Sequence, residues 1–448
     1  MENGLERKEY LFSNRDLRKL VIPLLVEQFL SIFVGLVDSI MVASVGEAAV
    51  SAVSLIDTVM ILLINVFLAL AMGGAIIAGQ ALGAKKGEEG CEVYEQSLIL
   101  SVGFSVLVMI LVYAGKWFIL NVLFGKIEPD VMRNCNIYLS ITTLSVPFIA
   151  AYNVGAAMHR AMGDSKTPMK MSVTMNLINV CGNAILLYGL KWGIEGAAVP
   201  TAVSRAFAGV WMLTLMKDRN KIRHIRTFAI RMKRGILRKI LHIASPYSLE
   251  NSMFQLGKIV LLSMVSGFGT ASIAANAVAN MVSEFAVVGG AAVSHAMSSV
   301  TAQCVGAGDY EQVRYYTRKL LKLSYLGLII INVFIIVFLP VIIYVYGLSP
   351  ETGEMARWII VFHGVNAMLI WAPSFNLPNV LRAANDVRFC MWTSVGSMWC
   401  FRIGLCFILS LKFGLGVYGV WISMITDWFV RSIIFTVRYR SRRWEMKK

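Results

Sequence analysis

The sequence predicts an all-α membrane protein with 12 transmembrane helices in two pseudo-symmetric six-helix bundles. Three observations support this fold class. The chain is 57% hydrophobic and only 15% charged, whereas soluble domains carry about 25% charged residues. Its apolar residues form runs of roughly 20–30 residues, each sufficient for one helix that crosses a bilayer. Finally, motifs in the first half of the chain recur in the second half at a constant spacing.

Hydropathy predicts about twelve spans along the chain. The first span is Leu20–Gly46, and the charged residues before it do not resemble a cleaved signal peptide, which has a short apolar region and a cleavage site. The predicted centres of the twelve spans are Phe33, Leu62, Ser105, Leu144, Val180, Ala206, Leu256, Val287, Ile331, Ala367, Leu405 and Thr426.

Lysine and arginine predict the orientation of these spans. The segment Lys217–Lys239 holds ten basic residues against one acid, Asp218. With twelve spans and both termini cytoplasmic, all the basic clusters fall on one side, as the positive-inside rule requires. The other clusters are Ala84–Lys86, Arg160–Lys170, Arg314–Lys322, Arg382–Arg388 and Arg438–Lys448. We therefore expect a multi-pass protein of the cell membrane (plasma or inner membrane), and the net charge of +16 does not require a nucleic-acid partner.

The chain also repeats itself at an offset of 223 residues. Pro23-x-x-x-Glu27 recurs as Pro246-x-x-x-Glu250, and Gln80–Ala84 recurs as Gln303–Ala307. Six helices are an even number, so both copies would enter the membrane from the same side, related by an axis along its normal. We predict an N-terminal bundle at residues 1–220 and a C-terminal bundle at residues 221–448, which begins with the basic connector. Further matches are Gly46 with Gly269, Gly193 with Gly416, Gly196 with Gly419 and, at an offset of 222, Arg160–Asp164 with Arg382–Asp386.

Five motifs give the chain a specific resemblance to a known family. They are Val37–Val42 (VDSIMV), Gln80–Ala84 (QALGA), Met158–Pro168 (MHRAMGDSKTP), Asn176-x-x-Asn179 and Asn379–Phe389 (NVLRAANDVRF). With these motifs the sequence resembles the multidrug and toxic compound extrusion (MATE) family of secondary antiporters over nearly its whole length. The resemblance implies two bundles around a V-shaped cleft and export of organic, often cationic, compounds driven by inward sodium or proton flow. No cofactor other than the coupling ion is expected.

Asp38 is the residue on which the predicted mechanism depends. It lies about 27 Å along the first span at about 1.5 Å per residue, where a charge costs at least about 2.5–3.5 kcal/mol. Asp57, Asn179 and Asn183 are expected at a compatible depth, so the four are candidates for a cation or proton site. The resemblance matches Asp38 and Asn179 to family positions, whereas Asn183 replaces an acid found in many members. The alternatives are a structural acid at Asp38 and asparagines that hold helices together.

Five other polar side chains lie within predicted spans. Glu27 and Glu250 each follow a proline by one turn, so we expect them either to line the cytoplasmic mouth as gating residues or to satisfy the backbone that the proline frees. For Arg205 and Asp427, in the last spans of the two bundles, we expect a packing or interfacial role. For His295 we expect a structural role rather than a proton relay.

The second half differs from the first in its charges. At the 223-residue offset Leu261 replaces Asp38, and Arg402 replaces Asn179. Lys258, Glu284 and Arg402 fall at middle depth, where a lone charge is costly and a paired one is tolerated, so we expect an ion-pair cluster. One hypothesis is that Lys258 stands in for a bound cation and leaves coupling to the first bundle. A second hypothesis is that Lys258 and Arg402 bind an anionic part of the substrate.

The sequence therefore predicts a monomeric antiporter, in contact with membrane lipids, that exports small organic compounds in exchange for inward H⁺ or Na⁺ by alternating access. A flippase for a lipid-linked or phosphate-bearing amphiphile is the alternative, because such a substrate needs basic residues like Lys258 and Arg402. An enzyme is not expected: the sequence shows no nucleophile motif, and its histidines do not cluster as metal ligands. The seven scattered cysteines suggest neither a disulfide framework nor a metal site.

Overall fold

The computed structural model describes residues 10–125, 127–215 and 232–445. In these ranges the chain forms helices and no strand. The helices of the first half are α1 (Asn14–Ala43), α2 (Glu47–Gly83), α3 (Gly87–Ala114), α4 (Lys116–Phe118), α5 (Pro129–Leu144), α6 (Val146–Ala161), α7 (Lys166–Asn183) and α8 (Glu195–Leu215). Those of the second half are α9 (Arg234–Val265), α10 (Thr270–Ala286), α11 (Val288–Gly306), α12 (Tyr310–Val345), α13 (Pro350–Asn366), α14 (Ala372–Phe375), α15 (Leu377–Ala383), α16 (Val387–Ser397), α17 (Leu405–Phe407) and α18 (Gly416–Arg440).

Six short segments of other helix types extend or interrupt these helices. One is a 3₁₀ turn, η3 (Ser266–Phe268). The others are π-helical, with wider turns than an α-helix: η1 (Ile119–Leu123), η2 (Ala184–Gly189), η4 (Ala367–Trp371), η5 (Met398–Gly404) and η6 (Ile408–Lys412).

Twelve helical spans can be traced through the described residues. Nine helices there are long and apolar enough to cross a membrane, and eleven spans result when two bent pairs each count as one. The pairs are α5 with α6, bent by 47°, and α10 with α11, bent by 46°. α9 supplies the twelfth span with 32 residues, among which Glu250 and Lys258 lower its hydropathy. The predicted layout is confirmed, and the predicted centres Leu144 and Val287 lie beside the two bends.

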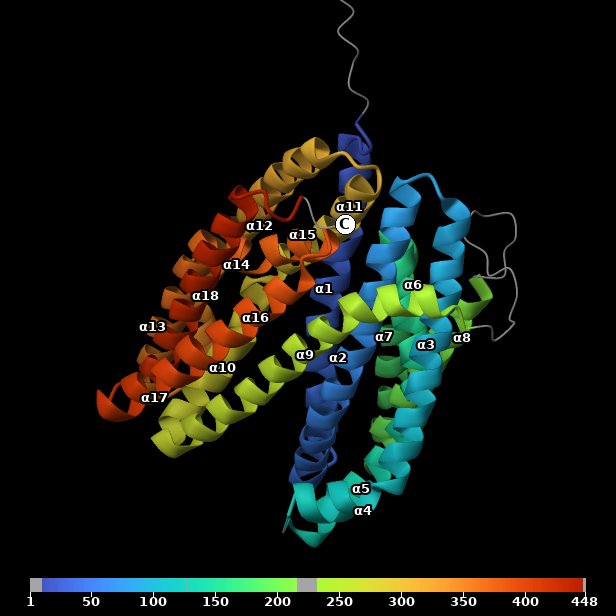
Figure 1. Cartoon of the computed structure of the whole chain (residues 1–448). Coiled ribbons are helices and arrows are strands. Elements are labelled where there is room, and N and C mark those ends of the chain that lie inside the picture. The colour runs from blue at the N-terminus through green and yellow to red at the C-terminus, as the bar shows by residue number, and fades with distance from the viewer. Residues whose placement is uncertain (1–9, 126, 216–231, 446–448) are drawn as a thin grey trace, which may run out of the picture.

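The helices form two groups that meet at one end of the molecule (Figure 1). We call this the junction end; there Gln80–Gly83 of α2 lie against Gln303–Gly306 of α11. Toward the other end, where α5 and α17 lie, the two groups diverge in the figure. α9 connects the groups, because it packs on α2 and α3 and also on α16. The predicted bundle boundary at residues 220 and 221 lies outside the described residues.

Each group of helices has an apolar core of its own. The core of the second half, which includes Leu261, Trp371 and Trp421, draws all its buried residues from α9 to α18 and the π-helical turns between them. A second core, around Ile56 and Phe67, is built almost entirely from the first half. Many large apolar side chains on the outside of both groups are exposed, as expected for a surface that meets lipid.

The same tight turn connects the first two helices of each half. Gly46 precedes α2 with φ of 128°, and Gly269 precedes α10 with φ of 88°. Side chains disfavour this backbone region, whereas glycine adopts it readily. The same backbone conformation therefore accounts for glycine at both positions of this pair, which was predicted from the repeat.

The repeated Arg-to-Asp motifs form corners at the junction end. In the first copy Asp164 accepts hydrogen bonds from the amide of Thr167 at 3.2 Å and its hydroxyl at 2.8 Å, and the His159 ring lies 3.2 Å away. Burial raises the pKa of Asp164, but the hydrogen bonds from His159 and Thr167 outweigh it and hold this pKa well below its usual range. In the second copy Asp386 pairs with Arg438 of α18 at 2.8 Å.

A buried ion pair is also repeated in the two halves. Glu27 of α1 pairs with Arg160 of α6, and Glu250 of α9 pairs with Arg382 of α15 at 2.6 Å. Both carboxylates are less than one-tenth exposed. In the described residues each carboxylate accepts hydrogen bonds only from its arginine, so neither glutamate bonds to the backbone near its proline. Their role at a cytoplasmic mouth stays a prediction.

We expect Glu250→Gln to destabilise the protein, because the substitution leaves the buried Arg382 without its counter-charge. Breaking a buried pair in this way costs about 3–5 kcal/mol, so the unfolding temperature of the purified protein in detergent should fall clearly. Glu354→Gln is the matched control, because Glu354 is exposed. Equal unfolding temperatures for the two variants would contradict a stabilising role of the pair.

Candidate functional site

Asp38 is bonded to a side chain that the sequence placed in the same site. The Asn183 amide of α7 donates a hydrogen bond to Asp38 Oδ1 of α1. Asn183 is fully buried, whereas Asp38 is half-buried. Asn183 is the last residue of α7, and the π-helical turn η2 follows it directly. The carboxylate thus has one oxygen held by the protein while the side chain keeps some accessibility.

Asn179 lies one turn before Asn183 and bonds to a different partner. Its amide donates to the Thr201 hydroxyl of α8 at 3.1 Å, and that hydroxyl donates to the Ala197 carbonyl at 2.9 Å. Residues four apart lie on one face of a helix, so both asparagines point toward the same side of α7. Asn179 does not bond to Asp38 directly.

Asp57 of α2 lies near Asp38 and shares a cationic neighbour with it. The Arg205 guanidinium of α8 interacts electrostatically with both carboxylates. The Tyr138 hydroxyl of α5 is a polar neighbour of Asp57 and of Thr201. We call the seven side chains the acidic cluster: Asp38, Asp57, Tyr138, Asn179, Asn183, Thr201 and Arg205.

The structure therefore brings together all four residues predicted for the coupling site, and it adds three that the sequence analysis did not assign to it. Arg205 was expected to have a packing or interfacial role, whereas it lies beside the two acids and donates to Ser145 Oγ at 3.3 Å. Thr201 and Arg205 are four residues apart on one face of α8. A polar stripe on an apolar helix is the sequence feature that could have identified them.

The predicted charge cluster of the second half is looser than expected. Lys258 and Glu284 are exposed, Arg402 is half-buried, and among the described residues no ion pair within 4 Å joins any two of them. The expected direct ion pairs are therefore not formed. Lys258 nevertheless has Arg402 and Glu284 as its electrostatic neighbours. Arg402 lies in the π-helical segment η5.

A buried acid and a buried base of α18 lie near Arg402. Asp427 of α18 is fully buried and accepts a hydrogen bond from Ser397 Oγ at 2.5 Å. Arg431, one turn further along α18, is 2% exposed and donates to Ser394 Oγ at 3.1 Å. Asp427 interacts electrostatically with both Arg402 and Arg431. Asp427 was expected to have only a packing or interfacial role, and Arg431 was missed.

Arg431 is enclosed by aromatic rings. Its guanidinium lies 4.7 Å from the ring centre of Phe375, 5.2 Å from Phe254 and 5.9 Å from Phe435. A desolvated cation over an aromatic face is stabilised by about 2 kcal/mol. Two of its nitrogens, Nε and one Nη, have no hydrogen-bond partner among the residues that the structure describes. The interior of the second bundle is therefore rich in cations, whereas the acidic cluster of the first bundle holds two acids and one base.

The two bundles are joined at the junction end by reciprocal contacts. The Gln80 side chain of α2 donates to the Ala383 carbonyl at 2.8 Å and to Asn385 Oδ1 at 3.2 Å. Conversely, the Gln303 side chain of α11 donates to the Ala161 carbonyl at 2.6 Å. Gln80 and Gln303 are equivalent in the repeat, and so are the two acceptors Ala161 and Ala383, one residue short of the common offset.

Two glycines allow this approach. A Cβ atom on Gly83 would lie 1.9 Å from the Gln303 carbonyl oxygen, and one on Gly306 would lie 1.9 Å from the Gln80 carbonyl oxygen. No side chain fits in either place without moving the backbones apart. We call these four residues the junction clasp: Gln80, Gly83, Gln303 and Gly306.

The arrangement found here matches a known family. The sequence model of MatE matches the chain twice, at residues 23–185 and 246–408. The chain belongs to the MatE family. The two matched segments are 223 residues apart, which is the offset of the repeated motifs. The resemblance to MATE transporters stated from the sequence is thereby confirmed.

Relatives cover nearly the whole chain. It is 25% identical over 434 residues to YisQ of Bacillus subtilis, an uncharacterized transporter, with 95% of this chain and 94% of the relative covered. It is 24% identical over 450 residues to the probable multidrug resistance protein NorM of Thermotoga maritima, with 100% and 96% covered. A solved outward-facing multidrug resistance MATE transporter of the MOP superfamily shares the fold, with a TM-score of 0.89, 20% identity and 95% of both chains covered. The MatE chain is thus a multi-pass membrane transporter.

We expect Gly306→Ala to loosen the junction clasp, because the added methyl group collides with the backbone of α2. Hydrogen–deuterium exchange of the purified protein should show faster uptake in residues 80–86 and 303–309. Gly103→Ala is the control, since a Cβ at this helical glycine meets nothing within 4 Å. Unchanged exchange in both segments would show that the clasp does not hold the bundles together.

Proposed function

We propose that this MatE protein exports small organic compounds, cationic or amphiphilic, in exchange for inward H⁺ or Na⁺, by alternating access of its two bundles. The junction end would face the cytoplasm. Tyr10 and Glu445 both contact the start of α12, at 4.7 Å between the Tyr10 and Tyr315 rings and 2.7 Å from Arg314 to Glu445. Both described chain ends and the predicted basic loops then lie on one side, in agreement with the positive-inside rule.

The acidic cluster is the observation that supports coupling to a cation. Asp38 and Asp57 carry two negative charges when ionised, and Arg205 supplies one positive charge. One monovalent cation, H⁺ or Na⁺, would balance the remainder, so the cluster is suited to exchange a single charge in each cycle. Asn183, where many family members have an acid, keeps Asp38 oriented without adding a negative charge. An ionisable group at membrane depth is typical of such ion pathways.

The exchange would proceed through competition for Asp38. When the cluster faces the outside, a coupling ion binds the Asp38 carboxylate. The bound ion weakens the interactions of this carboxylate with its other partners. When the bundles tilt and the junction clasp opens, the cluster becomes accessible to cytoplasmic solvent. The ion then leaves, because its concentration is lower in the cytoplasm or because the membrane potential favours its release there. The half-buried state of Asp38 supports this access, and its bond to Asn183 keeps the carboxylate in place between steps.

We expect Asp38→Asn to abolish export of a fluorescent dye from cells that lack their own pumps. The variant keeps its hydrogen-bonding shape but loses the charge that binds the coupling ion. Imposing sodium and pH gradients separately identifies the ion in the wild type. Asp130→Asn, at an exposed acid at the start of α5 and outside the acidic cluster, should export normally. Dye export by a folded Asp38→Asn protein at the wild-type rate would refute the coupling role.

The cationic interior of the second bundle supports a second candidate, a flippase for a phosphate-bearing amphiphile. Lys258 is exposed, Arg402 lies near it, and Arg431 has two nitrogens without a hydrogen-bond partner in the described part of the chain. Arginine binds phosphate through paired hydrogen bonds, so the three residues could hold an anionic group. The same charges also agree with Lys258 standing in for a bound cation.

The variant Lys258→Met tests whether transport needs the positive charge of Lys258. We expect it to reduce transport strongly, because either role of Lys258 needs its ammonium group, while the methionine keeps a side chain of similar length. Lys412→Met, at an exposed lysine in η6, should leave transport unchanged. Competition assays with cationic and with anionic amphiphiles then distinguish the two candidates. Normal transport of every tested compound by Lys258→Met would exclude both roles.

A further inference from the structure

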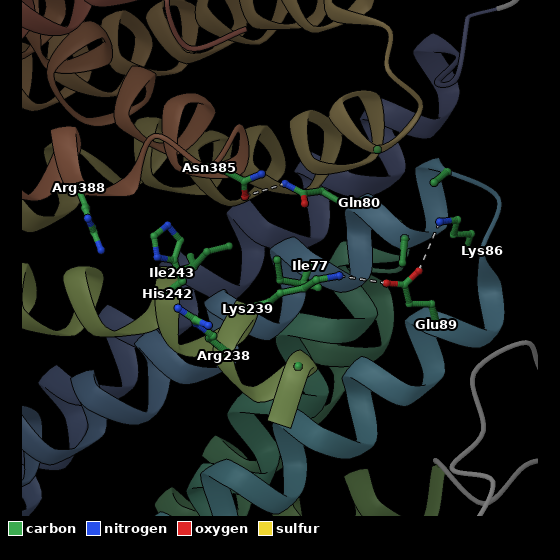
Figure 2. Close-up of a pocket in the computed structure, with 14 residues that line it drawn as sticks. Ile77, Gln80, Lys86, Glu89, Arg238, Lys239, His242, Ile243, Asn385 and Arg388 are labelled. Carbon is green, nitrogen blue, oxygen red and sulfur yellow. Dashed lines mark hydrogen bonds and ion pairs between the residues drawn. The ribbon is translucent and has the colours of Figure 1, made fainter. Parts of the chain in front are cut away.

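A large pocket lies beside the junction clasp, between the two halves of the chain (Figure 2). Its volume is about 1070 Å³. The first half contributes residues from α2 and the start of α3, and the second half contributes residues from α9, Gly306 of α11, and Asn385 and Arg388 at the start of α16. Gln80 and Gly306 belong both to the pocket wall and to the clasp. Whatever occupies the pocket therefore touches both bundles next to the contact that holds them together.

The pocket wall carries an excess of positive charge. Four lysine and arginine side chains line it against one acid, Glu89, and His242 adds a fifth basic group. Glu89 is shared by Lys86 at 3.8 Å and Lys239 at 3.5 Å. The remaining basic side chains are Arg238, His242 and Arg388.

These three basic side chains have no partner. Among the described residues none of them makes a hydrogen bond or an ion pair. Figure 2 shows Arg238, His242 and Arg388 on one side of the pocket, opposite Lys86 and Glu89. Like charges in a concave site repel one another unless an anion lies between them. The unpaired arginines thus point to an anionic ligand.

We propose that this pocket binds a phosphate-bearing anion, with Arg238 and Arg388 as its principal ligands. Arginine forks match the oxygen geometry of phosphate. The pocket lies where the spans end at the junction end, which is the depth of lipid headgroups, and basic pockets between helices at this depth bind anionic headgroups. The ligand is therefore either the headgroup of an anionic phospholipid or a soluble phosphate compound.

The positive-inside rule alone does not account for this pocket. A second basic hollow of about 570 Å³ lies at the same end, around the start of α12. Two of its four basic residues have partners, Arg314 with Glu445 at 2.7 Å and Lys319 with Asn14. Apart from Tyr10, its lining residues come from α12 alone. Its place beside the junction clasp and its walls from both halves of the chain distinguish the first pocket from this hollow.

An anion in the pocket favours the conformation in which the clasp is closed. It attracts Arg388 of the second half and competes with Glu89 for Lys86 of the first half, and these groups separate if the bundles part at the junction end. This regulatory effect rests on the proposed alternating access, whereas binding itself does not. Ligand that binds the closed form more tightly than the open form shifts the population toward the closed form.

The test uses the full-length protein in nanodiscs and measures its unfolding temperature. One series compares discs of phosphatidylcholine alone with discs that also contain phosphatidylglycerol. The other series titrates soluble pyrophosphate into phosphatidylcholine discs. We expect a saturable rise in unfolding temperature in one series, because a ligand that binds only the folded state stabilises it. A rise with the lipid identifies a headgroup site, and a rise with pyrophosphate identifies a soluble ligand.

The variant Arg238→Gln with Arg388→Gln should need at least tenfold more ligand for the same rise, because it lacks both principal ligands. The control, Lys166→Gln with Lys170→Gln, removes two exposed basic residues at the start of α7, outside the pocket, and should respond as the wild type does. An equal response of both double variants, or no response of the wild type in either series, would overturn the proposal. Neither outcome depends on transport, so the coupling role of Asp38 is tested separately.

Discussion

The backbone contact between α2 and α11 is the interaction on which the arrangement of the two bundles depends. At Gly83 and Gly306 the two helices approach so closely that not even a methyl group fits between them. The glutamine side chains beside these glycines reach into the opposite bundle and bond to its carbonyl groups. Small residues permit such approach in membranes, where apolar surfaces give helices little reason to prefer each other over lipid. Backbone packing and hydrogen bonds therefore hold the junction end closed.

Around this contact the two halves share a framework and differ in their interior charges. Both contain the turn with positive φ, the buried glutamate–arginine pair and the corner that ends in an aspartate. The interior of the first half has Asp38 and Asp57 around one arginine. The second half instead has Lys258, Arg402 and Arg431 near two acids. Repeated residues thus maintain the geometry, and residues that are not repeated determine which charges each bundle can bind.

Much of this could be predicted from the sequence, because it depends on local patterns. Apolar runs predict the spans, and the constant offset predicts the two halves. Asp38, Asp57, Asn179 and Asn183 could be grouped by depth alone, since each lies on a span whose start is predictable from the sequence. The roles predicted for them remain predictions.

The parts that the sequence did not predict depend on contacts between distant segments. Arg205 and Arg431 interact with residues on other helices, which the sequence alone does not bring together. In addition, depth alone does not say which side of a helix faces the interior. The bends beside Leu144 and Val287 were also missed, because hydropathy averages over a span and does not detect a change of direction. Likewise, the ion pairs expected among Lys258, Glu284 and Arg402 are absent from the described residues, since similar depth does not ensure a short distance.

The reciprocity of the junction clasp has a consequence for how such a duplicated chain can change over time. Each glycine touches the other copy, not its own, so a larger residue in one half must be accommodated by the partner half. The two copies therefore constrain each other at the clasp long after duplication. Their interiors carry no such mutual restriction, and one fold can acquire opposite charge preferences in two halves that still close against each other.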